Sequence, residues 1–247
     1  MTEIYTPTIS ERESMRMNAD EFKVSGDGVF FTIQGEGQSI GKPAVFLRLN
    51  FCNLQCGWCD TKYTWDRKSK EFWQDAENWD YQKTLSEIER YPVKRLVITG
   101  GEPLIQQERI SKFVDLIPSW DIEIETNGTI PPTQTLADKC QFNVSPKLEN
   151  SGNALNRRYK PEVLSQFNEL PNTTFKFVVK SERDLDEISQ LVEDCSLDPS
   201  KIIIMPEGTT DDDIKTHALE VVEGVKERGW RLTPRLHVLL WGDKRGI

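Results

Sequence analysis

The sequence predicts an α/β fold built on a mostly parallel sheet, in the form of a full or partial α/β barrel. Short apolar, β-branched runs alternate with amphipathic helical segments along most of the chain. Strands that alternate with helices favour parallel pairing through right-handed crossovers. No repeat or linker divides the 247 residues, so we expect one domain over residues 26–247 after a polar extension over residues 1–25.

Eight apolar runs have the length and residue types of buried strands. They cover residues 29–33, 44–50, 95–99, 122–126, 141–145, 173–179, 201–205 and 232–241, and Pro234 interrupts the last of them. Helical spacing of apolar residues marks three segments, at 110–117, 185–192 and 214–225. The third has clear end signals, because Thr210 can cap its free amides and Gly229 suits the position after its last turn.

The composition argues against several classes of function. A net charge of −9 does not suit a nucleic-acid partner. The chain has no run of about eighteen apolar residues that could span a membrane, and its first residues lack the apolar stretch of a secretory signal. We therefore expect a cytoplasmic protein, in which clustered cysteines indicate metal or redox chemistry rather than structural disulfides.

One segment, residues 62–81, interrupts the alternation of strands and helices. It is highly charged and yet carries Trp65, Phe72, Trp73 and Trp79. One interpretation is an ordered surface insertion whose aromatic side chains anchor it in the core. The other is a lid, or a surface for a partner or a second copy, beside the cysteines that precede it.

Polar motifs follow the predicted strands at their carboxyl ends. The sequence TGGEP begins at Thr99, ETNG at Glu125, SPK at Ser145 and MPEG at Met205. Each could be only a strand-ending turn, since glycine, proline and asparagine are the residues that turns need. In parallel sheets and barrels, however, this edge carries the active site. We therefore predict that the motifs share one pocket.

Three of the five cysteines, Cys52, Cys56 and Cys59, stand in the spacing C-x3-C-x2-C after the second predicted strand. Thiolates favour zinc, copper(I) or iron–sulfur clusters. A structural zinc site needs a fourth protein ligand, but Cys140 and Cys195 are distant and read as ordinary buried thiols. His237 could complete a zinc site, although nothing local pairs it with the loop. Three close cysteines with an open corner suit a [4Fe–4S] cluster.

With these motifs, the sequence resembles the radical S-adenosylmethionine superfamily. The cysteine spacing, the aromatic Trp58 before the third cysteine and the TGGEP motif carry the resemblance. Within the superfamily, the chain is similar to the 7-carboxy-7-deazaguanine synthase family through QGEG at residues 34–37, Arg48, CDT at residues 59–61, SPK at residues 145–147 and the ending LHVLLWGDKRG. The similarity covers roughly residues 29 to 247.

The resemblance implies a fold, a reaction and partners. It implies a partial, open barrel with the active site at the carboxyl ends of its strands, and a homodimer. The reaction takes 6-carboxy-5,6,7,8-tetrahydropterin to 7-carboxy-7-deazaguanine and ammonia, on the route to queuosine. The implied cofactors are a [4Fe–4S] cluster, S-adenosylmethionine and Mg²⁺, with an external electron donor such as flavodoxin or ferredoxin.

The resemblance also implies roles for individual residues, all of which we treat as predictions. The cluster ligands are Cys52, Cys56 and Cys59, and Thr61 is a ligand of Mg²⁺. The residues expected to contact S-adenosylmethionine are Trp58, Cys59, Asp60, Gly101, Glu102, Asn127, Ser145, Pro146 and Lys147. Those expected to contact the substrate are Ile33, Gln34, Gly35, Glu36, Arg48, Thr99 and His237, with the carboxylate of Ile247 as a further candidate.

Arg48 also supports this prediction on physical grounds, because it stands in the apolar run VFLRLN. A buried guanidinium needs an anionic partner, and its planar fork suits a carboxylate. Two rival readings are a glycyl-radical activating enzyme, which shares the cysteine and TGGEP motifs, and a zinc-binding module. The activating enzyme acts on a protein backbone and would not need QGEG or an inward-pointing Arg48.

Overall fold

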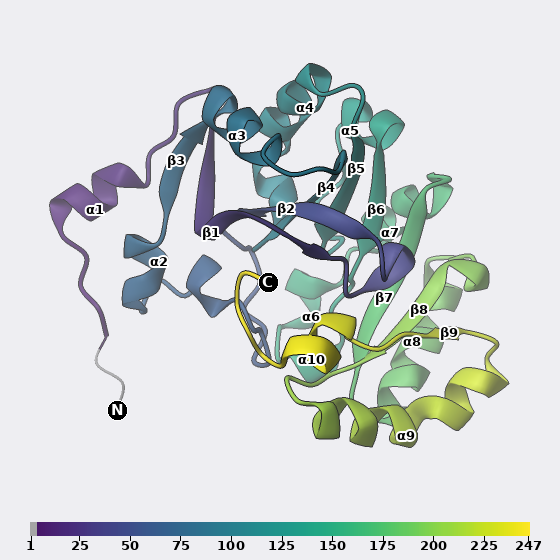
Figure 1. Cartoon of the computed structure of the whole chain (residues 1–247). Coiled ribbons are helices and arrows are strands. Elements are labelled where there is room, and N and C mark those ends of the chain that lie inside the picture. Colours follow the sequence, from purple (N-terminus) through teal and green to yellow (C-terminus); the bar gives the residue numbers. More distant parts are fainter. Residues whose placement is uncertain (1–3) are drawn as a thin grey trace.

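A nine-stranded sheet runs through the part of the chain that this computed structural model describes, residues 4–247. Its strand order is β3-β1-β2-β4-β5-β6-β7-β8-β9, and the two ends do not meet. β1 pairs antiparallel with β2 and β3, whereas every pair from β2 through β9 is parallel. Figure 1 shows the sheet curved but open, which confirms the predicted mostly parallel, partial α/β barrel.

The strands and helices alternate along most of the chain. The strands are β1 (Glu21–Ile33), β2 (Pro43–Leu49), β3 (Glu77–Asp80), β4 (Arg95–Gly100), β5 (Asp121–Thr126), β6 (Cys140–Val144), β7 (Thr173–Val179), β8 (Ile202–Pro206) and β9 (Arg231–Leu232). The helices are α1 (Ile9–Ser14), α2 (Lys70–Gln74), α3 (Tyr81–Ile88), α4 (Gln107–Leu116), α5 (Gln134–Lys139), α6 (Leu155–Arg158), α7 (Pro161–Glu169), α8 (Glu182–Asp194), α9 (Asp211–Glu227) and α10 (Leu236–Trp241).

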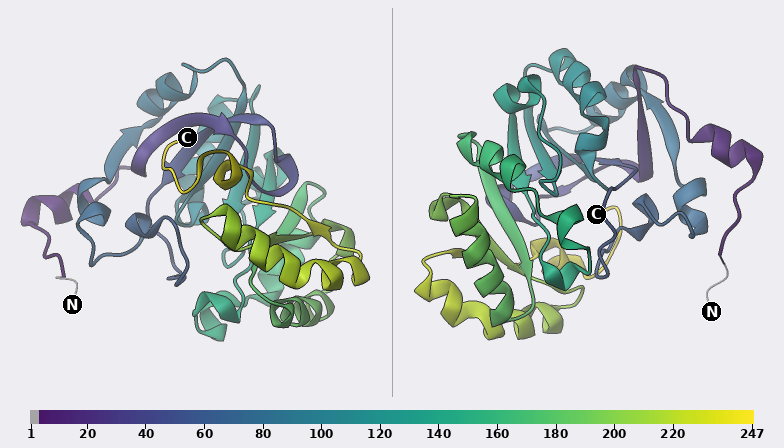
Figure 2. Two further views of the ribbon diagram at one scale, coloured as in Figure 1. Left: turned by 60° about the horizontal axis from the view of Figure 1, so that its bottom comes forward. Right: turned by 180° about the vertical axis from the view of Figure 1, so that it is seen from behind.

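The main hydrophobic core lies between the sheet and the helices on its convex face. Buried residues of alternate strand positions, such as Leu47, Ile98 and Phe142, pack there against helical residues such as Phe113 and Phe167. A small second cluster on the other face contains Phe30, Ala44, Phe46 and Val97. Figures 1 and 2 show α10 and the segment after it, in yellow, lying across this concave side of the sheet.

Two strand predictions were wrong, one at the beginning of β1 and one after β9. β1 begins at Glu21 rather than at residue 29, so Glu21–Ser25 belong to the sheet and not to the extension. Its first half resembles a turn in sequence because Gly26 and Gly28, both at φ +66°, form an irregularity between Val24 and Val29. The predicted strand at 232–241 ends at Leu232, and the remainder forms helix α10.

Proline explains the second error. Pro234 has no amide hydrogen to continue the ladder that joins β9 to β8. The last backbone bond of this edge is donated by Thr233 to the carbonyl of Ile204. The apolar run that follows, LHVLLW, then folds as a short helix with only Val238 buried. The signals at the ends of α9 are confirmed, because Thr210 caps it and Gly229 follows it at φ +66°.

The insertion at residues 62–81 is ordered and contributes an edge strand to the sheet. It contains a 3₁₀ turn (Lys62–Thr64), α2 and β3, which pairs with the beginning of β1. Phe72 and Trp79 are buried, as expected for aromatic anchors, whereas Trp65 lines a cavity beside the cysteines. Of the predicted extension, residues 1–3 lie outside the described part. Within residues 4–247, no helix is long and apolar enough to cross a membrane.

Candidate active site

A cavity of about 530 Å³ opens on the concave face, at the carboxyl ends of the parallel strands. It brings together residues from nearly the whole sequence, as predicted for the shared pocket. The predicted site residues that line it are Ile33, Gln34, Gly35, Glu36, Arg48, Cys52, Cys56, Trp58, Cys59, Asp60, Thr61, Thr99, Gly101, Asn127, Ser145, Lys147, His237 and Ile247. Two predicted residues, Glu102 and Pro146, do not line it.

Glu102 is fully buried below the cavity wall. Its carboxylate accepts hydrogen bonds from the backbone of Leu104 and the hydroxyl of Thr126, and from the backbone of Asn127 at 2.6 Å. Burial raises its pKa, although these bonds oppose the shift. Glu102 therefore supports the loop that carries Asn127, and the structure gives it no exposed surface for a cofactor.

The two glycines of TGGEP let the β4 loop pass close to the chain just before the cysteines. Gly100 has φ +135°, and a Cβ on Gly100 or Gly101 would clash with backbone atoms of Leu49 or Phe51. The backbone amides of Gly101 and Glu102 donate to the carbonyls of Leu49 and Phe51. The glycine pair thus fixes the cysteine loop against β4.

The three cysteines of the loop are free thiols that face the same cavity. Burial raises the pKa of Cys52 to about 12 and also raises the pKa of Cys56. Cys52 and Cys56 would therefore become thiolates where a metal centre supplies positive charge. Within residues 4–247 no three His, Cys, Asp or Glu side chains are placed to hold a single metal ion. A cluster is larger than one ion and suits this spacing.

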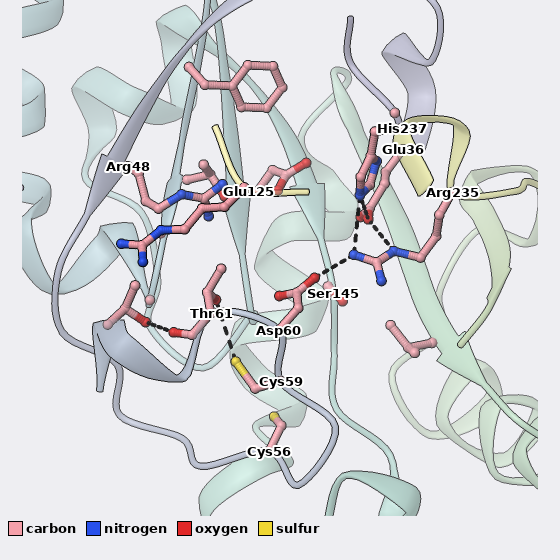
Figure 3. A pocket seen from close by; sticks show the side chains of 18 of the residues that line it. Glu36, Arg48, Cys56, Cys59, Asp60, Thr61, Glu125, Ser145, Arg235 and His237 are labelled. Carbon is pink, nitrogen blue, oxygen red and sulfur yellow. Dashed lines mark hydrogen bonds and ion pairs between the residues drawn. The ribbon is translucent and has the colours of Figure 1, made fainter. Parts of the chain in front are cut away.

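The opposite wall of the cavity is a network of charged side chains, in which Lys176 is buried, Glu36 and Arg235 are partly buried and Asp60 is exposed (Figure 3). Lys176 on β7 bonds to Glu36 and lies 3.8 Å from Glu125. Arg235, just before α10, donates to Glu36 at 2.9 Å and to Asp60 at 2.5 Å. Burial alone would raise the pKa of Glu36 and Asp60, but the cations outweigh it and both pKa values lie below their ordinary range. These carboxylates are ionised at neutral pH.

Arg48 differs from these cations because no carboxylate of residues 4–247 pairs with it. It comes from β2, next to Thr99 of β4 in the parallel register, and its guanidinium lies 5.2 Å from the centre of the Phe30 ring. Its side chain is half-buried in the cavity wall (Figure 3). A partly buried guanidinium without a carboxylate partner is the arrangement expected of a cation that binds an anionic ligand.

The segment from β1 that follows Ile33 is held by hydrogen bonds of its own. The Gln34 amide donates to Glu123 at 2.7 Å and to Glu125 at 3.1 Å. Glu125 also accepts from the hydroxyl of Thr99 at 3.0 Å. Gly35 accepts a bond from the amide of Leu236, and a Cβ there would clash with the His237 ring. His237 therefore lies on a helix rather than on the predicted strand, packed against this segment.

Sequence reasoning missed three of the charged residues in the cavity, Glu125, Lys176 and Arg235. Lys176 had the same signal as Arg48, a single cation inside an apolar strand (TTFKFVV). Glu125 had a weaker one, since it begins the ETNG motif. Arg235 follows a proline in a segment predicted as strand, and nothing in the sequence indicates that it reaches Glu36 and Asp60.

Known proteins are similar in sequence to this chain along most of its length. A family model described as a 4Fe-4S single cluster domain matches residues 33–160. The 7-carboxy-7-deazaguanine synthase of Pyrobaculum aerophilum is 34% identical over 222 residues, which cover 88% of this chain and 95% of that protein. The protein of the same name from Escherichia coli K12 is 32% identical over 234 residues, covering 86% and 96%.

The fold agrees with these relatives. The crystal structure of QueE from Escherichia coli superposes with a TM-score of 0.67 at 29% identity, over 88% of this chain and 95% of that one. Fold and site together define a radical S-adenosylmethionine enzyme with a [4Fe–4S] cluster. Within that class the chain belongs to the 7-carboxy-7-deazaguanine synthase family.

Proposed function

We propose that this chain converts 6-carboxy-5,6,7,8-tetrahydropterin to 7-carboxy-7-deazaguanine with loss of ammonia. The relatives named 7-carboxy-7-deazaguanine synthase support the reaction. The observation that carries it is Arg48, which lines the same cavity as the three cysteines and pairs with no carboxylate of residues 4–247. The carboxylate of the pterin supplies the missing anion, and the planar guanidinium can bind it through two parallel hydrogen bonds.

Cys52, Cys56 and Cys59 are the ligands that we assign to the cluster. When bound, the cluster and S-adenosylmethionine supply the 5′-deoxyadenosyl radical that starts the reaction. The residues assigned to S-adenosylmethionine are Trp58, Cys59, Asp60, Gly101, Asn127, Ser145 and Lys147, all of which line the cavity. Lys147 donates to the carbonyl and hydroxyl of Ser145 at 2.8 and 2.7 Å, so the two side chains present one polar surface.

The charged wall opposite Arg48 would orient the other end of the substrate. Glu36 and Glu125 are held by Lys176 and Arg235, and their oxygens can accept the N–H groups of a pterin edge. Gln34 fixes the neighbouring turn, and Thr99 stands between Arg48 and Glu125. The substrate thus meets a cation at one end and acceptors at the other, which defines one orientation.

Thr61 is our proposed protein ligand for Mg²⁺. Its hydroxyl lies 3.5 Å from the sulfur of Cys59 and lines the cavity (Figure 3). Mg²⁺ prefers oxygen ligands and retains several waters, so a site with one hydroxyl plus substrate oxygens is chemically ordinary. We also propose that the enzyme is a cytoplasmic homodimer that takes its electrons from a protein such as flavodoxin or ferredoxin.

The test is an anaerobic turnover assay with reconstituted protein, the carboxytetrahydropterin, S-adenosylmethionine and a reductant, with and without Mg²⁺. We expect 7-carboxy-7-deazaguanine and ammonia in equal amounts, and a higher rate with Mg²⁺. A protein that carries a full cluster and cleaves S-adenosylmethionine but forms no deazaguanine would refute the proposed reaction. An equal rate after removal of divalent cations would refute the role of Thr61 alone.

A further inference from the structure

Each sulfur of the three-cysteine loop accepts a hydrogen bond from an N–H group. The backbone amide of Leu54 donates to Cys52 at 3.4 Å. The side-chain amide of Asn153 donates to Cys56 at 3.3 Å, and the indole of Trp65 donates to Cys59 at 3.3 Å. The first donor belongs to the loop itself. The other two are side chains from separate segments, and neither has been given a role above.

Asn153 belongs to a segment that clamps the outer side of the loop. The carbonyl of Ser151 accepts from the amide of Gly57 at 3.0 Å, and the side-chain oxygen of Asn153 accepts from the amide of Gln55 at 2.8 Å. Because that oxygen is committed to a backbone N–H, the NH₂ end of the amide must face Cys56. The neighbouring contacts thus fix which end of Asn153 meets the sulfur.

Trp65 comes from the insertion at residues 62–81. Its backbone amide closes the 3₁₀ turn through the carbonyl of Lys62, and its ring lines the cavity. An indole nitrogen can only donate, so its contact with Cys59 has one possible direction. The Trp65 indole reaches a cysteine, whereas the Trp73 indole of the same insertion donates to the carbonyl of Arg67.

We infer that Asn153 and Trp65 are positioning residues that hold two cluster ligands and set the reduction potential of the cluster. The inference rests on the proposed role of Cys56 and Cys59 as ligands. A hydrogen bond to a ligating sulfur withdraws negative charge from it and stabilises the reduced, more negative form of the cluster. Both donors therefore raise the potential and make the cluster easier to reduce by a weak donor.

The test measures the potential of the cluster by spectroscopic redox titration in anaerobically reconstituted protein. Trp65→Phe removes the indole N–H and keeps an aromatic ring at this position. Asn153→Asp keeps the oxygen that accepts from Gln55 and replaces the donor. We expect each variant to shift the reduction equilibrium about tenfold toward the oxidised form, which is about 59 mV for one electron, and the double variant to shift it further.

Two matched controls isolate the N–H groups. Trp73→Phe removes an indole donor from the same insertion without touching a cysteine. Asn156→Asp adds a negative charge on α6, at an exposed position near Asn153. Both should keep the wild-type potential.

The outcomes are distinct. Wild-type potentials in cluster-loaded Trp65→Phe and Asn153→Asp would overturn the inference and leave the proposed function intact. Loss of the cluster from a variant that remains folded by circular dichroism supports the positioning role, provided that the controls keep theirs. A folded Cys56→Ala variant that keeps its cluster would instead overturn the ligand assignment on which the inference rests.

Discussion

Two lysines are buried in the same sheet, one in the cavity wall and one near the opposite edge. Lys176 of β7 is paired with Glu36 and lies 3.8 Å from Glu125. Lys23 of β1 donates only to the carbonyl of Ser14, and no carboxylate of residues 4–247 pairs with it. Burial lowers the pKa of both, but the carboxylates outweigh it at Lys176, whose pKa is raised, whereas the pKa of Lys23 falls to about 8.

The comparison shows that the partner, rather than burial, decides what a buried cation does. In the cavity wall, Lys176 and Arg235 keep Glu36, Asp60 and their own charges in place before any ligand binds. Pre-formed charges of this kind orient a ligand without further reorganisation. Near the sheet edge, Lys23 joins the segment before β1 to the sheet by a hydrogen bond, and burial of its charge destabilises the fold. Arg48 is a third case, a cation whose anionic partner we propose to be the substrate.

Replacement of Lys176 by methionine should give the largest effect on stability. It leaves Glu36 and Glu125 buried with one cation fewer, and breaking a buried pair in this way costs about 3–5 kcal/mol. We expect the free energy of unfolding, measured by urea denaturation at pH 7, to fall by that amount. Lys176→Arg, which keeps the charge, should lose clearly less. A Lys176→Met variant as stable as the wild type would show that the pairing of Lys176 with carboxylates does not stabilise the fold.

Replacement of Arg48 by alanine should weaken binding of the substrate with little effect on stability. Loss of the cation leaves the substrate carboxylate without its partner, at a cost of about 2–5 kcal/mol. Calorimetry with the carboxytetrahydropterin measures this, and unfolding in urea supplies the contrast with Lys176. Arg48→Lys should bind with intermediate affinity, because an ammonium cannot form the two parallel bonds. Equal substrate affinity in wild type and Arg48→Ala would remove this residue from the site.

Lys23 predicts a rise of stability with pH. Its pKa is about 8 in the folded protein and near 10.5 in the unfolded chain. Between these values the unfolded chain binds more protons, so folding becomes more favourable as the pH rises, by up to about 3 kcal/mol. Below pH 8 the folded protein carries the full cost of the buried charge.

The measurement is urea unfolding of wild type and Lys23→Met from pH 7.5 to 10.5. Other groups titrate in this range in both proteins, so the difference between the two proteins isolates Lys23. We expect Lys23→Met to be the more stable at pH 7.5 and the difference to shrink as the pH rises. A difference that stays constant across the range would show that Lys23 keeps an ordinary pKa.

Much of the fold was predictable because buried strands and capped helices leave local signals. The runs from 44–50 to 201–205, the cap at Thr210 and the glycine after α9 all follow from residues adjacent in sequence. The two errors arose where local signals conflict with pairing. Polar residues and glycines at 25–28 conceal the first half of β1, whose pairing with β2 and β3 comes from far along the chain. Apolar composition concealed α10, which Pro234 separates from the sheet.

The site follows the same division. Motifs that carry their chemistry in one segment, such as the three cysteines and TGGEP, were found from spacing. Roles that depend on contacts between residues far apart in sequence were not predicted. Glu102 accepts from the backbone of Asn127, Arg235 donates to both Asp60 and Glu36, and Asn153 donates to Cys56. Such contacts depend on how strand ends are brought together, and no spacing along one strand encodes them.

The smallest expected effect concerns a solvent-exposed ion pair, which can be compared with the ion pairs of the cavity. Arg183 and Glu149 form an ion pair at 2.8 Å, about as short as the Arg235–Glu36 pair of the cavity at 2.9 Å, but their side chains are 82% and 68% exposed. Water screens such a pair, and each side chain loses rotamer freedom to form it, so its net contribution is about 0–1 kcal/mol. We expect the coupling energy from a double-mutant cycle of Arg183→Ala and Glu149→Ala, measured by urea unfolding, to lie within that range. A coupling near that of the Lys176 pair would mean that distance alone, without burial, determines the strength of these ion pairs.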